Sequence, residues 1–261
     1  MQAHDDLTLL INAARQAGDV ALKFTGPDAQ KWEKPDGAGP VTEADLAVDE
    51  ALTGILRGAR PDYGWLSEET DDDDARLSQD TVFIVDPIDG TRNFIEGGRT
   101  WAHSIAVAHK GQITAGVVYL PMRDMLYAAV LGTGATLNGD TLYASSQADL
   151  SKAELLSAKP NMRDQFWIGP VPSFARAYRP SLAYRCALVG QGRFDGMITF
   201  RPTWEWDIAA GALIASEAGA RVSDRTGKAL RFNQADPRTH GILAAAPKVH
   251  SALVAQHIPD A

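Results

Sequence analysis

Thr81–Thr91 reads TVFIVDPIDGT, a short, continuous apolar run that ends in two carboxylates. The apolar run predicts a buried strand. A tight bend should follow it, because Pro87 lacks an N–H and Gly90 permits unusual backbone angles. This segment therefore predicts a strand whose end carries two acidic side chains on a sharp turn.

The acidic groups on this bend are candidate metal ligands. The bend can aim Asp86, the Ile88 carbonyl and Asp89 at one point, and hard oxygen ligands of this kind suit Mg²⁺. Gly90 and Thr91 should open a short helix, whose free N–H groups would point at an anion such as phosphate. Metal ligands beside a phosphate cradle are what metal-assisted phosphoryl chemistry requires. Taken alone, the two aspartates could equally be ordinary turn residues.

Three further acidic elements lie outside this segment. Glu68 and Glu69 follow an apolar pair and could supply a metal ligand from a strand end, although acidic pairs are commonly just solvated. Asp45 stands three positions after Thr42, which suits either a capping-box helix start or a carboxylate that orients a hydroxyl or water. Asp207 precedes a run of small residues, which suits the N-cap of a closely packed helix and is compatible with a ligand role.

The overall composition is that of an ordinary globular protein, with 261 residues, 45% hydrophobic and 22% charged. The net charge of −8 argues against binding to a nucleic-acid polymer, which needs a basic face. No apolar run approaches the roughly 20 residues of a membrane helix, and the polar N-terminus does not resemble a secretory signal. Cys186 is the single cysteine, so no internal disulfide is expected and the cytoplasm is the expected compartment.

The pattern along the chain predicts an α/β protein, with an α+β half over residues 1–147 and an α/β half over residues 148–261. Apolar spacing and turn signals place the individual elements. Helices are expected at 6–24, from Thr42 onward, and at 173–178, 183–189, 207–217 and 247–256. Strands are expected at 81–85, 104–109, 113–120, 125–130, 135–137, 154–158, 196–199, 221–223 and 241–245.

Taken together, these elements resemble the inositol monophosphatase superfamily, the lithium-sensitive metal-dependent phosphatases. The family's metal motif, D-P-[IL]-D-G-T-x-x-F, is matched at positions 86–94, and its Glu-Glu motif at Ser67–Thr70. Its W-D-x-A-A-G signature is matched at Trp206–Gly211. The V-T-x-x-D element is Val41–Asp45, preceded by Lys34. The matches follow the family's order over nearly the whole chain.

The resemblance implies a layered αβαβα sandwich and a metal centre between its two halves. It implies that Glu68, Asp86 and the Ile88 carbonyl hold one Mg²⁺. Asp86, Asp89 and Asp207 would hold a second, and a third, weaker ion would lean on Glu68. The implied reaction is phosphomonoester hydrolysis by two-metal, in-line attack of water, which requires no catalytic histidine.

The resemblance also implies roles for groups beside the metals. The Gly90 and Thr91 amides would receive phosphate oxygens. Thr91, hydrogen-bonded to Asp45, would orient the attacking water, and Glu68 would complete the catalytic set. Members of the family are often homodimers, so a homodimer inhibited by lithium is expected.

Two substrate classes remain open. In inositol monophosphatases an acid about seven positions before the W-D aspartate contacts inositol hydroxyls, but Phe200 stands there in this chain. Residues 202–207, PTWEWD, look like the P-T-x-E-W-D of bacterial 3′(2′),5′-bisphosphate nucleotidases. On that reading Arg201 could meet a second phosphate and Trp204 an adenine, with Glu205 a further substrate-binding residue.

An inositol-1-phosphate-type substrate is slightly preferred, because positions 86–94 are closer to the inositol branch. The expected partner is therefore a small phosphorylated metabolite, with neither a nucleic-acid polymer nor a membrane. A weakly active regulatory or binding member of the same fold is the alternative of another class. Loss of a metal ligand would mark such a member, and every ligand is present here.

Overall fold

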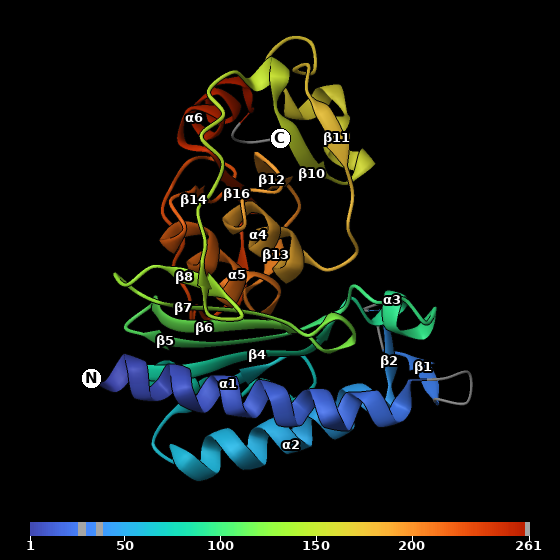
Figure 1. The fold of residues 1–261 in the computed structure, drawn as a ribbon, viewed down its shortest axis with the longest axis vertical. Coiled ribbons are helices and arrows are strands. Elements are labelled where there is room, and N and C mark those ends of the chain that lie inside the picture. Colours follow the sequence, from blue (N-terminus) through green and yellow to red (C-terminus); the bar gives the residue numbers. More distant parts are fainter. Residues whose placement is uncertain (26–29, 35–38, 259–261) are drawn as a thin grey trace.

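Helices and sheets alternate in five layers in the computed structural model, which describes residues 1–25, 30–34 and 39–258 (Figure 1). α1 and α2 cover one face of a seven-stranded sheet, α4 and α5 lie between this sheet and a five-stranded one, and α6 covers the outer face of the latter. The predicted αβαβα sandwich is confirmed. The helices are α1 (Gln2–Ala21), α2 (Glu43–Ala59), α3 (Thr91–Ile95), α4 (Leu182–Gly190), α5 (Glu205–Glu217) and α6 (Pro247–Gln256).

The seven-stranded sheet has the simple order β3-β4-β5-β6-β7-β8-β9. β3 and β4 are parallel and the other neighbours are antiparallel, as hairpins require. The strands predicted at 104–109, 113–120, 125–130 and 135–137 are therefore confirmed, and they form consecutive hairpins. The strands are β3 (Gly64–Ser67), β4 (Thr81–Asp89), β5 (Ala102–His109), β6 (Gln112–Leu120), β7 (Met125–Val130), β8 (Ala135–Leu137) and β9 (Asp140–Thr141).

β4 explains the apolar run that opens the metal motif. Successive side chains of a strand point to opposite faces. Phe83 and Val85 belong to the core under α1 and α2, whereas Val82 and Ile84 belong to the core around α4 and α5. Because both faces of the sheet are covered, the strand has no polar face and reads as a continuous apolar run.

α5 packs very closely on its neighbours, as its small residues predict. A Cβ on Gly211 would lie 2.6 Å from the Cβ of Cys186 in α4, and a Cβ on Gly116 of β6 would lie 3.0 Å from the Cα of Ala210. Contacts this close leave no room for larger side chains. The α4–α5 layer is thereby fixed between the two sheets.

The second sheet has the order β11-β10-β12-β16-β14, with β10 parallel to both of its neighbours. The core around α4 and α5 takes residues from both sides of the predicted division at residues 147/148, so it does not separate the two halves. The division therefore stays a prediction. The strands are β10 (Glu154–Ser157), β11 (Ala175–Ala177), β12 (Gly196–Thr199), β14 (Arg221–Ser223) and β16 (Ile242–Ala245). Two short pairs complete the set: β1 (Lys31–Glu33) with β2 (Pro40–Thr42), and β13 (Thr203–Trp204) with β15 (Arg238–Thr239).

The helix predicted at 173–178 is wrong. This segment instead forms the edge strand β11, in which Ala175 pairs with Glu154 of β10. The flanking Pro172 and Pro180 leave too little chain for a stable helix, and the open edge of β10 offers backbone partners instead. Among the described residues, no helix is both long and apolar enough to cross a membrane.

Candidate active site

A cavity of about 620 Å³ opens where the end of β4 meets the N-terminal ends of α4 and α5. Its lining comes from both halves of the chain and includes Asp86, Asp89, Arg185 and Asp207. The metal motif, which runs into the helix α3, therefore shares one space with the W-D signature, although the two are distant in sequence.

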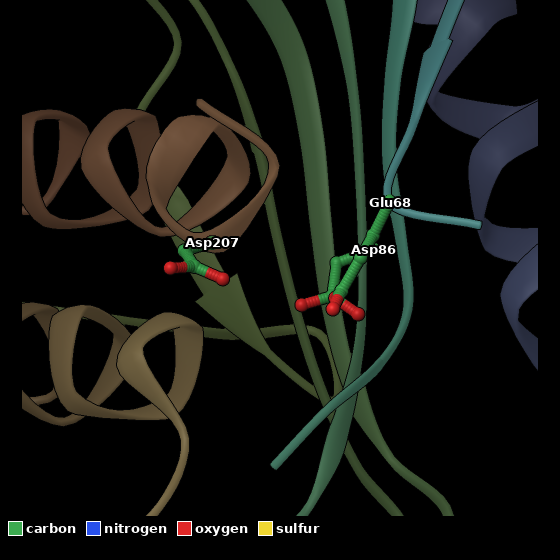
Figure 2. Close-up of side chains that lie close together, drawn as sticks. All are labelled: Glu68, Asp86 and Asp207. Atoms are coloured by element: carbon green, nitrogen blue, oxygen red, sulfur yellow. The ribbon is translucent and has the colours of Figure 1, made fainter. Parts of the chain in front are cut away.

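Three carboxylates come together at this cavity. Glu68, Asp86 and Asp207 each offer one oxygen, and these atoms lie within 4.8 Å of one another. Figure 2 shows Glu68 and Asp86 side by side at the ends of neighbouring strands, with Asp207 facing them from the first turn of α5. The predicted proximity of Asp86 and Asp207 is thus confirmed.

Asp86 is the most unusual of the three. Both of its carboxylate oxygens are buried and have no hydrogen-bond partner in the described part of the chain. Burial, together with repulsion from Glu68 and Asp89, raises the pKa of Asp86 well above its usual value. Desolvation likewise raises the pKa of Asp207, with repulsion from Asp89 and Glu68. Unpaired buried carboxylates are costly, and these hard oxygen donors fit a divalent cation such as Mg²⁺.

Asp89 lines the same cavity but is not one of the three clustered carboxylates. Its Oδ2 accepts hydrogen bonds from the Ser181 hydroxyl and the Ala183 N–H, each at 2.6 Å, at the start of α4. Burial raises its pKa to about 6, although these two hydrogen bonds oppose the shift. The β4–β5 pairing shifts register between Asp86 and Asp89, so the regular strand geometry is interrupted between these two carboxylates.

The predicted bend and short helix are both present directly after β4. Gly90 has a φ of +101°, a backbone conformation that residues other than glycine rarely adopt. It is the N-cap residue of α3. The Thr91 hydroxyl lies 3.1 Å from the Ile88 carbonyl and 3.3 Å from Oδ1 of Asp45. The predicted hydrogen bond between Thr91 and Asp45 is therefore present.

Asp45 fits both interpretations of its sequence position, because one of its oxygens caps a helix and the other faces a hydroxyl. Its Oδ2 accepts from the N–H and the hydroxyl of Thr42, at 2.8 and 2.5 Å, which completes a capping box at the start of α2. Its other oxygen faces Thr91. Burial, only partly offset by the Thr42 hydrogen bonds, raises the pKa of Asp45 to about 6.

Lys34 neutralises part of the acidic cluster. Its Nζ lies 2.9 Å from Oε1 of Glu68 and 2.7 Å from Oε1 of Glu69. Burial opposes the charge on Lys34, but the two carboxylates outweigh it and raise its pKa. Burial and the neighbouring Glu68 also raise the pKa of Glu69 to about 7.

Basic side chains supply part of the remaining lining, and most of them were not predicted. Arg92, Arg163 and Arg185 line the cavity together with the predicted Arg201. Arg185 is buried, donates to the Arg179 and Pro180 carbonyls, and lies over the Tyr178 ring. A lone arginine inside the apolar stretch LAYRCALVG was the available signal, because charge there requires a partner. The cavity thus has an acidic region and arginines, which suits an anionic substrate.

Two of the residues predicted to bind substrate, Trp204 and Glu205, already make contacts with other parts of the protein. Trp204 lines the cavity, but its ring is stacked on Trp206 at 4.6 Å and lies under the Arg238 guanidinium. A nucleobase would have to compete with these contacts. Glu205 is fully buried and accepts from the N–H groups of Asn233 and Gln234, so its position is inconsistent with the predicted substrate contact.

The N-cap prediction for Asp207 is wrong, because α5 begins at Glu205 and its N-cap is Trp204. Phe200 is buried against Trp167 and His257 and does not reach the cavity.

His103 and Cys186 are buried. The buried His103 ring makes a hydrogen bond to the Pro87 carbonyl, and burial lowers its pKa to about 4. Cys186 is buried in the core.

Residues 3–261 match the Inositol monophosphatase family. The chain is 36% identical to Nus factor SuhB of Salmonella typhimurium strain LT2 over 263 residues, covering 97% of this chain and 95% of the relative. It is 34% identical to Nus factor SuhB of Escherichia coli K12 with the same coverage.

Solved structures agree with this match. The extragenic suppressor protein suhB from Bartonella henselae has a TM-score of 0.83 at 28% identity, covering 96% of this chain and 97% of the other. An IMPase from Thermotoga maritima has a TM-score of 0.83 at 28% identity, with 96% of each chain covered.

Proposed function

The chain belongs to the inositol monophosphatase family, and from this premise we propose that it is a Mg²⁺-dependent phosphomonoesterase acting on a small phosphorylated metabolite. One observation carries the proposal. Both oxygens of Asp86 are buried without a partner, beside Glu68 and Asp207. A cation-binding role accounts for this arrangement, whereas a purely structural role leaves its electrostatic cost unexplained.

The proposed roles follow from the positions of the residues. Glu68, Asp86, the Ile88 carbonyl, Asp89 and Asp207 would hold two Mg²⁺ ions. When bound, these ions would lower the pKa of water and stabilise negative charge on the phosphoryl group.

The chain itself would orient the attacking water and bind the phosphate. The Thr91 hydroxyl, which lies within reach of both Asp45 and the Ile88 carbonyl, would orient the water. The N–H groups of Gly90 and Thr91 would bind phosphate oxygens.

The direct test is release of inorganic phosphate from inositol 1-phosphate. We expect release with Mg²⁺, none in excess chelator, and inhibition by lithium. Full activity in excess chelator would refute the metal mechanism.

For the substrate we propose an inositol-1-phosphate-type ester, with a bisphosphate nucleotide as the alternative. The contacts that Trp204 makes with Trp206 and Arg238 favour the first class, because they would compete with a stacked adenine. Arg185 and Arg201 favour the second, because a second phosphate would pair with guanidinium groups.

Arg201→Ala distinguishes these two classes. For a permissive inositol-type site, KM for inositol 1-phosphate and for 3′-phosphoadenosine 5′-phosphate should rise by similar factors, below about threefold. The exposed Arg221 lies outside the cavity, so Arg221→Ala is the matched control. An increase of about tenfold or more that is confined to the bisphosphate would assign the nucleotide class instead.

A regulatory or binding role is the second candidate, since the curated relatives are named Nus factor. Phosphate release separates the candidates, because a binding protein needs no turnover. We expect a kcat that rises with Mg²⁺, and its absence for every small ester tried would favour the second candidate.

We also propose a homodimer in the cytoplasm. Light scattering should give about twice the 28.0 kDa of one chain. A mass of one chain at micromolar concentration would contradict the dimer.

A further inference from the structure

A partly buried hydrogen-bond network joins the two metal-ligand segments outside the cavity. Its first member, Arg76, follows the Glu68–Thr70 segment, and its side chain is only 1% exposed. The Nε and one terminal nitrogen of Arg76 donate to the two carboxylate oxygens of Asp72, at 2.6 and 2.8 Å. The other terminal nitrogen donates to Oδ1 of Asn233 at 2.7 Å. This guanidinium therefore links two segments that are far apart in sequence.

Asn233 is the centre of the network. Its Nδ2 lies 3.2 Å from the Arg76 carbonyl, so its side chain both accepts from Arg76 and donates to it. Its N–H donates to Oε2 of Glu205 at 2.6 Å, and the N–H of Gln234 donates to Oε1 at 3.0 Å. Asn233 has φ of +58°, a left-handed conformation that asparagine tolerates better than most residues.

The two ends of the network carry the proposed ligands. Arg76 lies in a short 3₁₀ helix, Asp74–Ser78, eight positions after Glu68, and Glu205 is the first residue of α5, two positions before Asp207. The path from Glu68 to Asp207 through Arg76, Asn233 and Glu205 thus bridges the two halves. A metal centre needs its ligands held at fixed separation, and partners of the ligand-bearing segments are what hold them.

We propose that Asn233 is a positioning residue for the metal centre: by joining Arg76 to Glu205, it fixes the first turn of α5, and with it Asp207, relative to Glu68. The inference rests on the proposed function. It also gives Glu205 a role that its burial allows, in place of substrate contact.

Asn233→Gly tests the proposal without straining the backbone, because glycine adopts a positive φ freely. The variant removes both side-chain contacts with Arg76 and keeps the N–H that donates to Glu205. Asn233→Asp should restore an acceptor for Arg76 and tolerates the same φ. Gln234→Ala is the matched control, since it alters the neighbouring side chain and keeps the backbone N–H to Glu205.

The first measurement is Mg²⁺ binding by calorimetry, with no substrate present. We expect Asn233→Gly to weaken binding about tenfold, Asn233→Asp to recover most of the loss, and Gln234→Ala to match the unmutated protein. At saturating Mg²⁺, kcat and KM should change less than about twofold, because no group that touches substrate is altered. If Asn233→Gly lowers the stability of the protein but leaves its Mg²⁺ affinity unchanged, Asn233 has only a structural role and the proposal is overturned.

The second measurement is amide hydrogen exchange at Ile208–Ala212 in the first turns of α5. Asn233→Gly should exchange about tenfold faster there than the Gln234→Ala control, while α4 is unchanged. Equal exchange would overturn the proposal even if metal affinity changed. If the unmutated protein bound no Mg²⁺, the proposed function would fail, and exchange would still decide whether Asn233 holds α5.

Discussion

Asp86→Asn is expected to lower kcat/KM by about 10³-fold or more while raising the free energy of unfolding of the chelated protein by about 1–2 kcal/mol. Activity falls because the amide cannot supply the negative charge that a shared ligand brings to two cations. Stability rises because the buried carboxylate has no partner and its pKa is raised by burial. An amide of the same shape is also left unpaired, but burying a neutral group costs less than burying a charge.

The measurements are phosphate release and urea unfolding in excess chelator. Asp124→Asn is the control, because that side chain is 74% exposed and should change neither quantity. Loss of stability in Asp86→Asn would show that the carboxylate has a partner in solution. Activity within about tenfold of the unmutated enzyme would remove Asp86 from the ligands.

Mg²⁺ is expected to stabilise the protein by about 2.7 kcal/mol at pH 7.5, when its concentration is about 100 times the Kd at that pH, and by less at pH 5. The pKa values of Asp45 and Asp89 are raised to about 6, and that of Glu69 to about 7. Between about pH 4 and pH 7 these three carboxylates therefore bind more protons in the folded chain than in the unfolded chain. Their contribution to stability without metal falls as pH rises, by about 1.4 kcal/mol per pH unit for each extra proton.

Several other groups give the opposite slope, among them two buried histidines. Burial lowers the pKa values of His103 and His250 to about 4, so the unfolded chain binds their protons more tightly and stability rises with pH. Their contribution is common to both metal conditions. The difference between unfolding free energies in Mg²⁺ and in chelator therefore isolates the carboxylates.

Urea unfolding at pH 5 and pH 7.5 in both conditions measures that difference. A Mg²⁺ effect that is equal at the two pH values would mean that these carboxylates do not exchange protons for metal. A larger effect at pH 5 would reverse the assigned direction of the pKa shifts.

Local patterns predicted most elements near the site. The apolar run to Val85 and the capping box at Thr42 depend on residues within a few positions of one another. The small residues after Asp207 likewise predicted a closely packed helix. These features could be predicted because their physical causes are local.

Features that depend on distant partners could not be predicted in this way. The segment 173–178 is a strand only because β10 offers an edge, and Glu205 is buried only because the backbone at 233–234 reaches it. The proximity of Asp45 and Thr91 was implied by family resemblance, since nothing in their spacing requires it. Arg185 was missed because its partners are carbonyls of the preceding loop.

The α4–α5 layer has a consequence for synthesis on the ribosome. The last strand of the first sheet ends at Thr141, but the helix that covers the inner face of this sheet is complete only at Glu217. A nascent chain that has emerged only as far as Thr141 exposes the apolar face formed by residues such as Val82 and Ile84. Exposed faces of this kind promote aggregation during folding. Release of the first half alone should therefore yield an insoluble product, and chaperones should engage the chain until α5 has emerged.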